Sequence, residues 1–423
     1  MHAPNKIRHP KWVKILGPGL ITGAADDDPS GIATYSQAGA AFGFGQLWTI
    51  TLCLPLMIAV QEASARIGAI TGEGLVKVTS RLYPRTVLYG VVAMVVVANT
   101  INIGADIAAV GAALNLLIPL PIVLLSTIFT LVVLSLEIFI GYHAYTKFLK
   151  ILGLALLAYV ATALIVAEPW GEILRATVIP RIEWTSSYWY VIVGILGTTI
   201  SPYMFFWQAA EEVEENALAD RRGSAHRTIS EIRKDTAIGM GVSQIGSWFM
   251  IVTTATVLHA NGILNISTAS DAAKALEPLV QGFPHAGTYA KVLFALGIIG
   301  MGLLGIPVLA GSASYSVSEA LGWKGGLDLK FGQAPRFYIV IAVSTLIGLG
   351  ITMIGVDPIK ALVFAAVLNG LVAVPLVFLI AHISRNEKVM GEFAGKKLSR
   401  FLLSTTFIVL ALCALVLIAT LFL

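Results

Sequence analysis

The chain has 423 residues, of which 57% are hydrophobic and only 12% are charged, and its formal net charge is +4. Soluble globular domains carry about 25% charged residues, so a chain with half that share indicates a polytopic membrane protein. The composition therefore excludes a soluble globular protein. Its two cysteines, Cys53 and Cys413, both lie in apolar segments, so they provide no disulfide framework from which to infer a compartment.

The apolar segments predict the fold class. A membrane-spanning helix needs about 20 mainly apolar residues. Such runs predict eleven transmembrane helices, at residues 15–41, 46–69, 87–115, 121–141, 147–167, 188–212, 236–259, 287–318, 336–355, 358–382 and 401–423. The runs are continuous rather than alternating, which excludes the strands of a membrane barrel. We predict an all-α polytopic membrane protein with a single transmembrane domain over residues 1–423.

The basic residues predict the orientation. With the N-terminus in the cytoplasm, 23 of the 28 Lys and Arg residues lie on the cytoplasmic side, as the positive-inside rule requires. The exceptions on the opposite face are Arg175, Arg181, Lys274, Lys291 and Lys360. We therefore expect a multi-pass protein of the cell inner (plasma) membrane, with a cytoplasmic N-terminus and an external C-terminus. The net charge then reflects topology and does not indicate a nucleic-acid partner.

The first predicted span contains three consecutive aspartates and a proline, Asp26, Asp27, Asp28 and Pro29. A carboxylate at bilayer depth costs about 2.5 kcal/mol or more, so it is retained there for a function. Pro29 removes a backbone donor, so we expect the helix to break at this point. Unwound backbone inside a membrane is tolerated only where it is buried in protein or lines a cavity. Acidic side chains and freed carbonyls at one depth predict a cation site.

The third predicted span carries a polar stripe. Asn99, Asn102 and Asp106 are three and four residues apart, which places them on one face of a helix. We interpret this stripe as a water-lined pathway, and a structural cluster of hydrogen bonds is the alternative.

A second break is predicted in the sixth span, where Gly197-Thr198-Thr199-Ile200-Ser201-Pro202-Tyr203 interrupts the apolar run. The two prolines lie five spans apart, and an odd number of spans inverts the second copy of a repeat. Paired interruptions at matching positions of inverted halves indicate the substrate site of a transporter. We predict a first repeat at 15–167, a second at 188–382 and an extra C-terminal helix at 401–423.

Four glutamates follow the sixth span at Glu211, Glu212, Glu214 and Glu215. We interpret this acidic run as a solvated helix end, with an electrostatic funnel for divalent ions as the alternative.

These motifs resemble those of the Nramp family of divalent metal transporters over roughly residues 15–420. The likeness is strongest in Gly17-Pro18-Gly19, Asp28-Pro29-Ser30-Gly31, Gln37-Ala38-Gly39-Ala40, Ala105-Asp106-Ile107 and Ala113-Leu114-Asn115-Leu116-Leu117. The family's first-span motif Asp-Pro-Gly-Asn reads Asp28-Pro29-Ser30-Gly31 here, and its sixth-span motif Met-Pro-His reads Ser201-Pro202-Tyr203. The resemblance implies an inverted five-plus-five, LeuT-like fold with broken helices 1 and 6, and a site whose ligands have changed.

The resemblance also implies the site residues. Asp28 matches the metal-binding aspartate, Gly31 replaces a ligating asparagine, and Ser201 replaces a ligating methionine. The implied metal set is Asp28, the backbone carbonyls of Ala25 and Thr198, Ser201, and the positions of Tyr203 and Gly31; the implied proton or water pathway is Asp106, Asn102 and Gln208. Tyr203 and Gln208 stand where the family often has histidines, and Ala109 replaces the glutamate that follows the acidic residue of the proton route.

Purely structural roles remain open for two of these residues. An aspartate before a helix start is a common cap, and Asp28 can cap the second half-helix while it binds a metal. Ser201 can equally be a packing residue, or a hydroxyl bonded back to its own helix. We expect Asp26 and Asp27 to point in different directions from Asp28, with one of them lining the vestibule or pairing with a polar neighbour.

The altered ligands indicate the ion. A thioether favours transition metals, whereas carboxylate, hydroxyl, carbonyl and water suit Mg²⁺, Ca²⁺ and Mn²⁺, and Mg²⁺ usually retains several waters. The pattern resembles the Nramp-related magnesium transporters. We expect a secondary transporter, not an enzyme, that imports a hard divalent cation by alternating access, Mg²⁺ being favoured and Mn²⁺ possible, with weak or absent proton coupling. We expect no cofactor apart from the transported ion, and no partners apart from that ion and the lipid bilayer.

The alternatives differ in class. A proton-coupled Mn²⁺ or Fe²⁺ symporter of the Nramp type stays open. An organic-solute carrier is disfavoured because three aspartates beside the break would repel a carboxylate substrate. An intramembrane aspartyl protease is disfavoured because neither Asp28 nor Asp106 sits in a Gly-x-Gly-Asp setting. The sequence leaves the oligomeric state undetermined.

Overall fold

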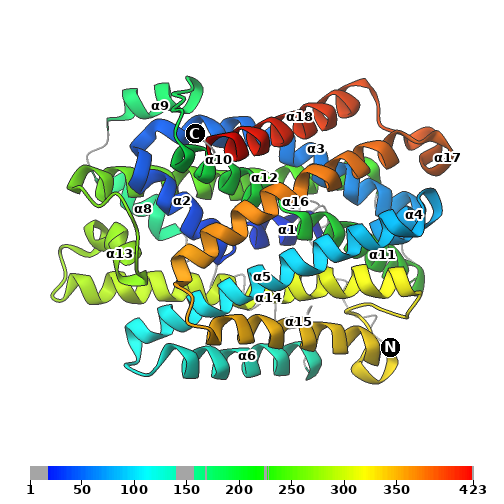
Figure 1. The fold of residues 1–423 in the computed structure, drawn as a ribbon, viewed down its shortest axis with the longest axis horizontal. Coiled ribbons are helices and arrows are strands. Elements are labelled where there is room, and N and C mark those ends of the chain that lie inside the picture. The colour runs from blue at the N-terminus through cyan, green and yellow to red at the C-terminus, as the bar shows by residue number, and fades with distance from the viewer. Residues whose placement is uncertain (1–17, 140–156, 167–168, 223–225, 227, 422–423) are drawn as a thin grey trace, which may run out of the picture.

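The computed structural model describes residues 18–139, 157–166, 169–222, 226 and 228–421, and all regular structure in these residues is helical. The longest helices run roughly along the long axis of the molecule, with α5, α14, α15 and α6 on one side and α3, α12, α16 and α18 on the other (Figure 1). The predicted all-α fold class is confirmed.

The helices of the first predicted repeat begin and end close to the predicted spans. They are α1 (Pro18–Asp26), α2 (Pro29–Phe42), α3 (Leu47–Thr71), α4 (Leu75–Leu82), α5 (Arg85–Leu117), α6 (Ile122–Phe139) and α8 (Leu157–Ile165), with a 3₁₀ turn at Gly43–Gln46. Most of the first half of the predicted fifth span, residues 147–156, lies outside the described residues, as do residues 15–17 of the first span.

The second half follows the same order of long and broken helices. Its elements are α9 (Trp170–Val178), α10 (Ser186–Thr199), α11 (Pro202–Arg222), α12 (Ile229–Val257), α13 (Ala269–Ala273), α14 (Ala286–Leu321), α15 (Pro335–Met353), α16 (Pro358–Arg385), α17 (Glu387–Met390) and α18 (Lys397–Thr420). Short 3₁₀ helices lie at His259–Asn261, Lys274–Val280, Phe331–Gln333 and Gly391–Phe393.

Both predicted helix breaks are present. The first separates α1 from α2 at Asp27 and Asp28, and the Asp28 side chain caps α2 by accepting a hydrogen bond from the Gly31 amide. Pro29 occupies the first position of α2, where its missing N–H removes no intrahelical bond. The second break separates α10 from α11, which also begins with a proline, Pro202.

Long unbroken helices hold the half-helices in place. Helix α12 packs along both α1 and α2, and α16 packs along α10. Glycines permit the close approach, since a Cβ on Gly23 would lie 2.3 Å from the Gly239 carbonyl oxygen. In the other pair, a Cβ on Gly197 would lie 1.9 Å from the Ala366 carbonyl oxygen. The two breaks are thus positioned by close backbone contacts.

Nine helical stretches in the described residues are long and apolar enough to cross a membrane. One of them, Pro29–Thr71, includes the second half of the first predicted span together with the second span. The remaining stretches match the third, fourth and sixth to eleventh predicted spans. Because the fifth lies partly outside the described residues, the total of eleven stays a prediction.

Candidate metal site

The carboxylate of Asp28 lies in the first break and has no exposed surface. Its Oδ1 accepts hydrogen bonds from Ser30 Oγ at 2.6 Å and from the Gly31 amide at 2.9 Å. Its Oδ2 accepts from Asn102 Nδ2 at 3.1 Å and from Tyr203 Oη at 3.3 Å. One oxygen therefore caps α2, while the other meets groups from α5 and α11. The capping role is present, and it leaves Oδ2 directed at the other elements of the site.

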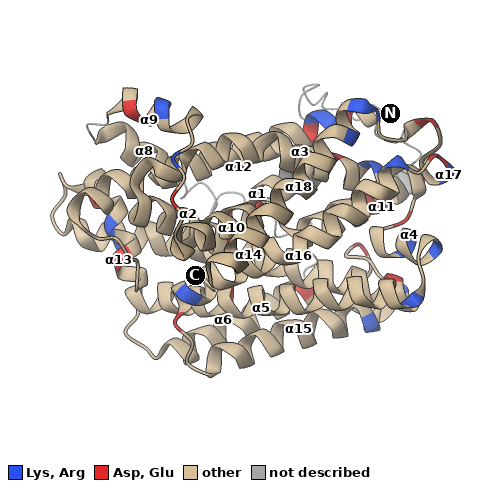
Figure 2. Ribbon diagram, turned by 45° about the horizontal axis from the view of Figure 1, so that its top comes forward, with Lys and Arg blue, Asp and Glu red and all other residues tan. Residues whose placement is uncertain are grey.

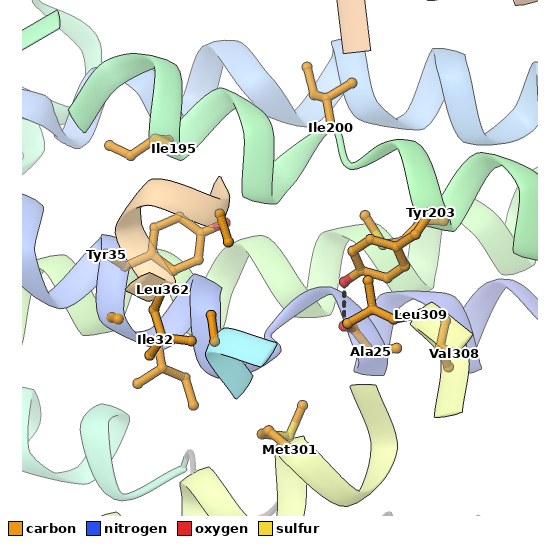
Figure 3. Close-up of a cluster of buried hydrophobic side chains, with 14 of the residues drawn as sticks. Ala25, Ile32, Tyr35, Ile195, Ile200, Tyr203, Met301, Val308, Leu309 and Leu362 are labelled. Carbon is orange, nitrogen blue, oxygen red and sulfur yellow. Dashed lines mark hydrogen bonds between the residues drawn. The ribbon is translucent and has the colours of Figure 1, made fainter. Parts of the chain in front are cut away.

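Tyr203 connects the two broken helices. Its hydroxyl lies 3.0 Å from the Ala25 carbonyl oxygen and 3.3 Å from Asp28 Oδ2. Figure 3 shows the ring extending from α11 toward Ala25 at the end of α1. A phenol has one proton, so it donates fully to only one of these oxygens at a time. The Tyr203 hydroxyl thus lies between two predicted ligand atoms.

Asn102 links Asp28 to the polar stripe of α5. Its Nδ2 donates to Asp28 Oδ2 and, at 3.3 Å, to Asp106 Oδ2, while its Oδ1 accepts from Asn369 Nδ2 at 3.2 Å. All of these side chains are fully buried, and Asp106 Oδ1 and Asn369 Oδ1 have no hydrogen-bond partner in the structure. Asn102 and Asp106 of the stripe are therefore connected to Asp28. Asn369 of α16, for which the sequence supports a place at the site and a polar contact between helices equally well, is part of this network.

Asn99 lies one turn before Asn102 and does not extend this network. Its Nδ2 donates to the Leu309 carbonyl oxygen of α14 at 3.0 Å.

Ser201 and Thr198 come from the second break. The Ser201 hydroxyl lies 2.6 Å from the Gly197 carbonyl oxygen and 2.7 Å from the Thr198 carbonyl oxygen. This is the arrangement bonded back to its own helix, which sequence reasoning leaves open. A carbonyl oxygen has two lone pairs, so the Thr198 carbonyl keeps one for a cation. The hydroxyl of Thr198 is buried without a hydrogen-bond partner in the structure.

Gly31 contributes its backbone amide to Asp28 and is closely surrounded. A Cβ at this position would lie 3.1 Å from Thr198 Oγ1 and 3.3 Å from the Asp26 carbonyl oxygen. Contacts of this length are tighter than most, so an asparagine here would displace its neighbours. Glycine at this position therefore permits the close approach of α2 to Thr198 in α10.

Gln208 lies further along α11 and joins a separate set of polar groups. Its amide accepts a hydrogen bond from Thr22 Oγ1 at 2.5 Å and donates to Glu212 Oε1 at 3.2 Å. Glu211 and Glu212 are each only 1% exposed. The interpretation of the acidic run as a solvated helix end is therefore wrong for these two residues, because the helices around α11 bury them.

Asp26 and Asp27 point away from Asp28 and toward α12. Asp26 Oδ2 accepts a hydrogen bond from Ser243 Oγ, and Asp27 Oδ1 accepts one from Ser247 Oγ at 3.1 Å. Both aspartates pair with polar neighbours, although sequence reasoning expects this of only one. Nothing in the local sequence reveals these partners, since the serines lie more than 200 positions away along the chain.

The four groups that donate hydrogen bonds to the Asp28 carboxylate are all uncharged. Among the described residues, no group of three or more His, Cys, Asp and Glu side chains is arranged to hold a metal ion. The hydrogen-bond partners of Asp28 Oδ2 are an amide and a phenol, and the nearby freed carbonyl is that of Ala25. The contacts to Asp28 Oδ2 therefore come from one nitrogen and one oxygen donor, both uncharged.

Comparisons with known proteins identify a family. The sequence model described as natural resistance-associated macrophage protein-like (Nramp) matches residues 19–420. The divalent metal cation transporter MntH of Yersinia enterocolitica is 27% identical over 403 residues, which cover 92% of this chain and 91% of that protein. The MntH protein of Chromohalobacter salexigens is 27% identical over 414 residues, which cover 93% and 88%.

Solved structures share the fold. The Eremococcus coleocola manganese transporter, in complex with an aromatic bis-isothiourea substituted compound, superposes with a TM-score of 0.74 at 17% identity, over 98% of this chain and 88% of that chain. MhsT in complex with L-phenylalanine superposes with a TM-score of 0.58 at 12% identity, over 95% and 98%. Both neighbours have the LeuT-like fold predicted for this chain.

Proposed function

The chain belongs to the Nramp family of divalent metal transporters, and we propose that it imports a hard divalent cation, with Mg²⁺ preferred over Mn²⁺. The observation that carries this proposal is the environment of Asp28. Its Oδ2 is contacted by the Asn102 amide and the Tyr203 phenol, and the Ala25 carbonyl oxygen accepts from the same phenol. Serine stands where the family's methionine would supply a thioether. Oxygen ligands without sulfur favour hard ions.

We further propose that Asp28, Ala25, Thr198, Ser201 and Tyr203 contact the ion or its water shell. In the described conformation Asn102 and Tyr203 hold Asp28 Oδ2, so an arriving ion would replace these hydrogen bonds at that oxygen. Gly31 adds space and no side-chain ligand. A single carboxylate leaves room for retained water molecules, which lowers the cost of dehydrating Mg²⁺.

Alternating access would use the two broken helices. Asp28 has no exposed surface, so the site is closed in this conformation. One turn beyond it, Ile32, Ala33 and Ser36 of α2 line a narrow, largely apolar cavity against α5, α13, α14 and α16. We propose that the site opens alternately toward this cavity and toward Gln208. Relative movement of the two repeats, 15–167 and 188–382 with the added helix 401–423, would open it, as in other transporters with inverted repeats.

Charge supports an orientation. Figure 2 shows more ribbon segments coloured for Lys and Arg around α4, α11 and α17, at one end of the molecule, than at the end near α9 and α13. We propose that the first end faces the cytoplasm of a plasma membrane, with the N-terminus inside and the C-terminus outside. The membrane potential then favours cation entry by about 2.3 kcal/mol per charge per 100 mV.

Proton coupling would be weak or absent. Asp106 is retained and hydrogen-bonded to Asn102, but Ala109 stands where the family carries its next acidic residue, and Tyr203 and Gln208 replace histidines. These replacements remove groups that carry protons through this region.

The second candidate is a proton-coupled Mn²⁺ or Fe²⁺ symporter. The names of the similar proteins favour it, since they are a manganese transporter and divalent metal cation transporters called MntH. The structural observation that supports this candidate is Asp106, which is retained and hydrogen-bonded to Asn102.

Uptake into proteoliposomes tests the proposal. We expect saturable Mg²⁺ uptake by the wild type, reported by an internal Mg²⁺-sensitive dye, without acidification of the vesicles. Asp28→Asn removes the charge and retains a residue that caps helices well, so it should fold and reduce uptake by about tenfold or more, as expected when a buried charged contact is lost. Equal uptake by wild type and Asp28→Asn would exclude Asp28 as a ligand. Mn²⁺ uptake that excludes Mg²⁺ and acidifies the vesicles would establish the second candidate.

A further inference from the structure

Two carboxylates beside the Asp28 site lack an explanation in the proposed function. Asp26 is fully buried and Asp27 is 6% exposed. The hydroxyl of Ser243 contacts both of them, by a short hydrogen bond to Asp26 Oδ2 and at 3.3 Å from Asp27 Oδ1. The hydroxyl of Ser247 lies 3.1 Å from Asp27 Oδ1. The four side chains thus form a cluster of oxygen atoms between the end of α1 and α12.

The cluster has fewer hydroxyl protons than it has contacts to acceptor oxygens. Each serine hydroxyl has one proton to donate, and that of Ser247 is also 3.1 Å from the Ser243 carbonyl oxygen. Two protons therefore serve four contacts to acceptors. The second oxygen of Asp26, Oδ1, is buried and has no hydrogen-bond partner in the structure. A buried carboxylate oxygen without a donor is costly, and either a bound cation or a proton on one carboxylate would relieve that cost.

Basic side chains do not supply a positive charge to this cluster in the part of the chain that the structure describes. The ion pairs there connect Arg66 and Arg233 to Glu62, and otherwise involve pairs near the helix ends. None of them includes Asp26 or Asp27. A bound cation would satisfy the oxygen atoms that the two serines leave unpaired.

We propose that Asp26, Asp27, Ser243 and Ser247 form a second cation site that takes a monovalent hard cation, Na⁺, beside the transported divalent ion. Carboxylate and hydroxyl oxygens are hard ligands. Asp27 and Asp28 are adjacent in the chain, so two divalent ions at the two sites would repel each other strongly. A monovalent ion halves that repulsion. This choice of charge rests on the proposed function, because it assumes a divalent ion at Asp28.

Binding of radioactive sodium to the purified full-length chain tests the proposal. The measurement is made in lipid nanodiscs near neutral pH, with the bulky cation N-methylglucamine keeping the ionic strength constant. We expect saturable binding of one Na⁺ per chain to the wild type and to Asp28→Asn. Asp27→Asn and the double variant Ser243→Ala/Ser247→Ala should bind Na⁺ about tenfold more weakly or worse, as expected for loss of a buried ligand contact.

Thr254→Val is the matched control. Thr254 lies further along α12, and its hydroxyl bonds back to the Met250 and Ile251 carbonyls of its own helix. Its substitution should leave Na⁺ binding unchanged. If Asp27→Asn does not elute as a single folded species, Ser247→Ala, which keeps both carboxylates, should still weaken Na⁺ binding.

Parallel binding of radioactive manganese separates this proposal from the proposed function. Loss of manganese binding in Asp28→Asn, with sodium binding retained, supports both. Absence of saturable sodium binding in the wild type overturns the second site. A proton shared by the two aspartates, in place of a cation, would give this result. Equal loss of sodium binding in Asp28→Asn overturns it too, because the ion would then occupy the divalent site. A wild type that binds sodium but no divalent ion contradicts the proposed function alone.

Discussion

Substitution of Ser201 tests whether the residue at this position affects ion selectivity. Its hydroxyl is bonded to the Gly197 and Thr198 carbonyls and makes no hydrogen bond to Asp28 among the described residues. Replacing it therefore breaks no hydrogen bond to the carboxylate, while Ser201→Met adds a soft thioether at the second break. We predict that Ser201→Met raises the uptake of Mn²⁺ relative to Mg²⁺ by about tenfold, equivalent to about 1.4 kcal/mol, measured by competition in proteoliposomes.

Ser201→Ala is the control for this prediction. It removes the hydroxyl without adding sulfur, so the ratio of Mn²⁺ to Mg²⁺ uptake should stay near that of the wild type. If the methionine and alanine variants show the same ratio, the residue at this position does not contact the ion.

The packing of α1 on α12 determines where the first break lies. Because a Cβ on Gly23 would come within 2.3 Å of the Gly239 carbonyl oxygen, Gly23→Ala forces the helices apart. Overpacking of this kind costs about 1–3 kcal/mol, so we predict a lower midpoint of thermal unfolding and reduced transport. Gly241→Ala is the control, since a Cβ there meets nothing within 4 Å, and alanine favours a helix by up to about 1 kcal/mol. A Gly23→Ala chain as stable as Gly241→Ala would show that this contact is not tight.

A buried charge cluster joins distant parts of the whole molecule. Glu62 of α3 accepts hydrogen bonds from Arg66 at 3.0 and 3.2 Å and from Arg233 of α12 at 2.8 Å. Arg66, only 1% exposed, also donates to the Phe393 carbonyl oxygen at 2.6 Å, in the segment that leads to α18. Removing one partner of a buried ion pair costs about 3–5 kcal/mol. We therefore predict that Glu62→Gln markedly lowers the midpoint of thermal unfolding.

An exposed ion pair provides the comparison. Glu172 lies 4.0 Å from Arg181, and both side chains are more than half exposed. Glu172→Gln should cost less than about 1 kcal/mol, because solvent screens the pair. Similar unfolding midpoints for Glu62→Gln and Glu172→Gln would contradict a stabilising role for the buried cluster.

Several features were predictable because they depend on chemistry that is local in the chain. The length of each apolar run predicts where α3, α5 and α16 begin and end to within about three residues. Pro29 and Pro202 each stand at the first position of a helix, and both breaks are found at the predicted positions. Proline alone does not predict a break, because Pro55, Pro307 and Pro375 lie inside continuous helices. The capping role of Asp28 follows from its place before Pro29.

Contacts between remote segments were not predictable in the same way. Asn102 reaches Asp28 across 74 positions and Asn369 across 267. Asp27 and Asp28 are neighbours in the break between α1 and α2, yet Asp27 contacts α12 whereas Asp28 contacts α5 and α11. From the sequence, charged residues near a helix end are predicted to be solvated. Glu211 and Glu212 are nevertheless buried, because other helices cover them.

The sequence alone specifies a membrane-spanning helical protein, two breaks and an acidic cluster at the first break, since hydropathy and proline act through near neighbours. The packing of the helices specifies which oxygen atoms meet at each break, and it separates one aspartate facing α5 and α11 from two facing α12. The physical reason is that a ligand set requires atoms within about 3 Å, and that distance depends on how helices distant in sequence pack together.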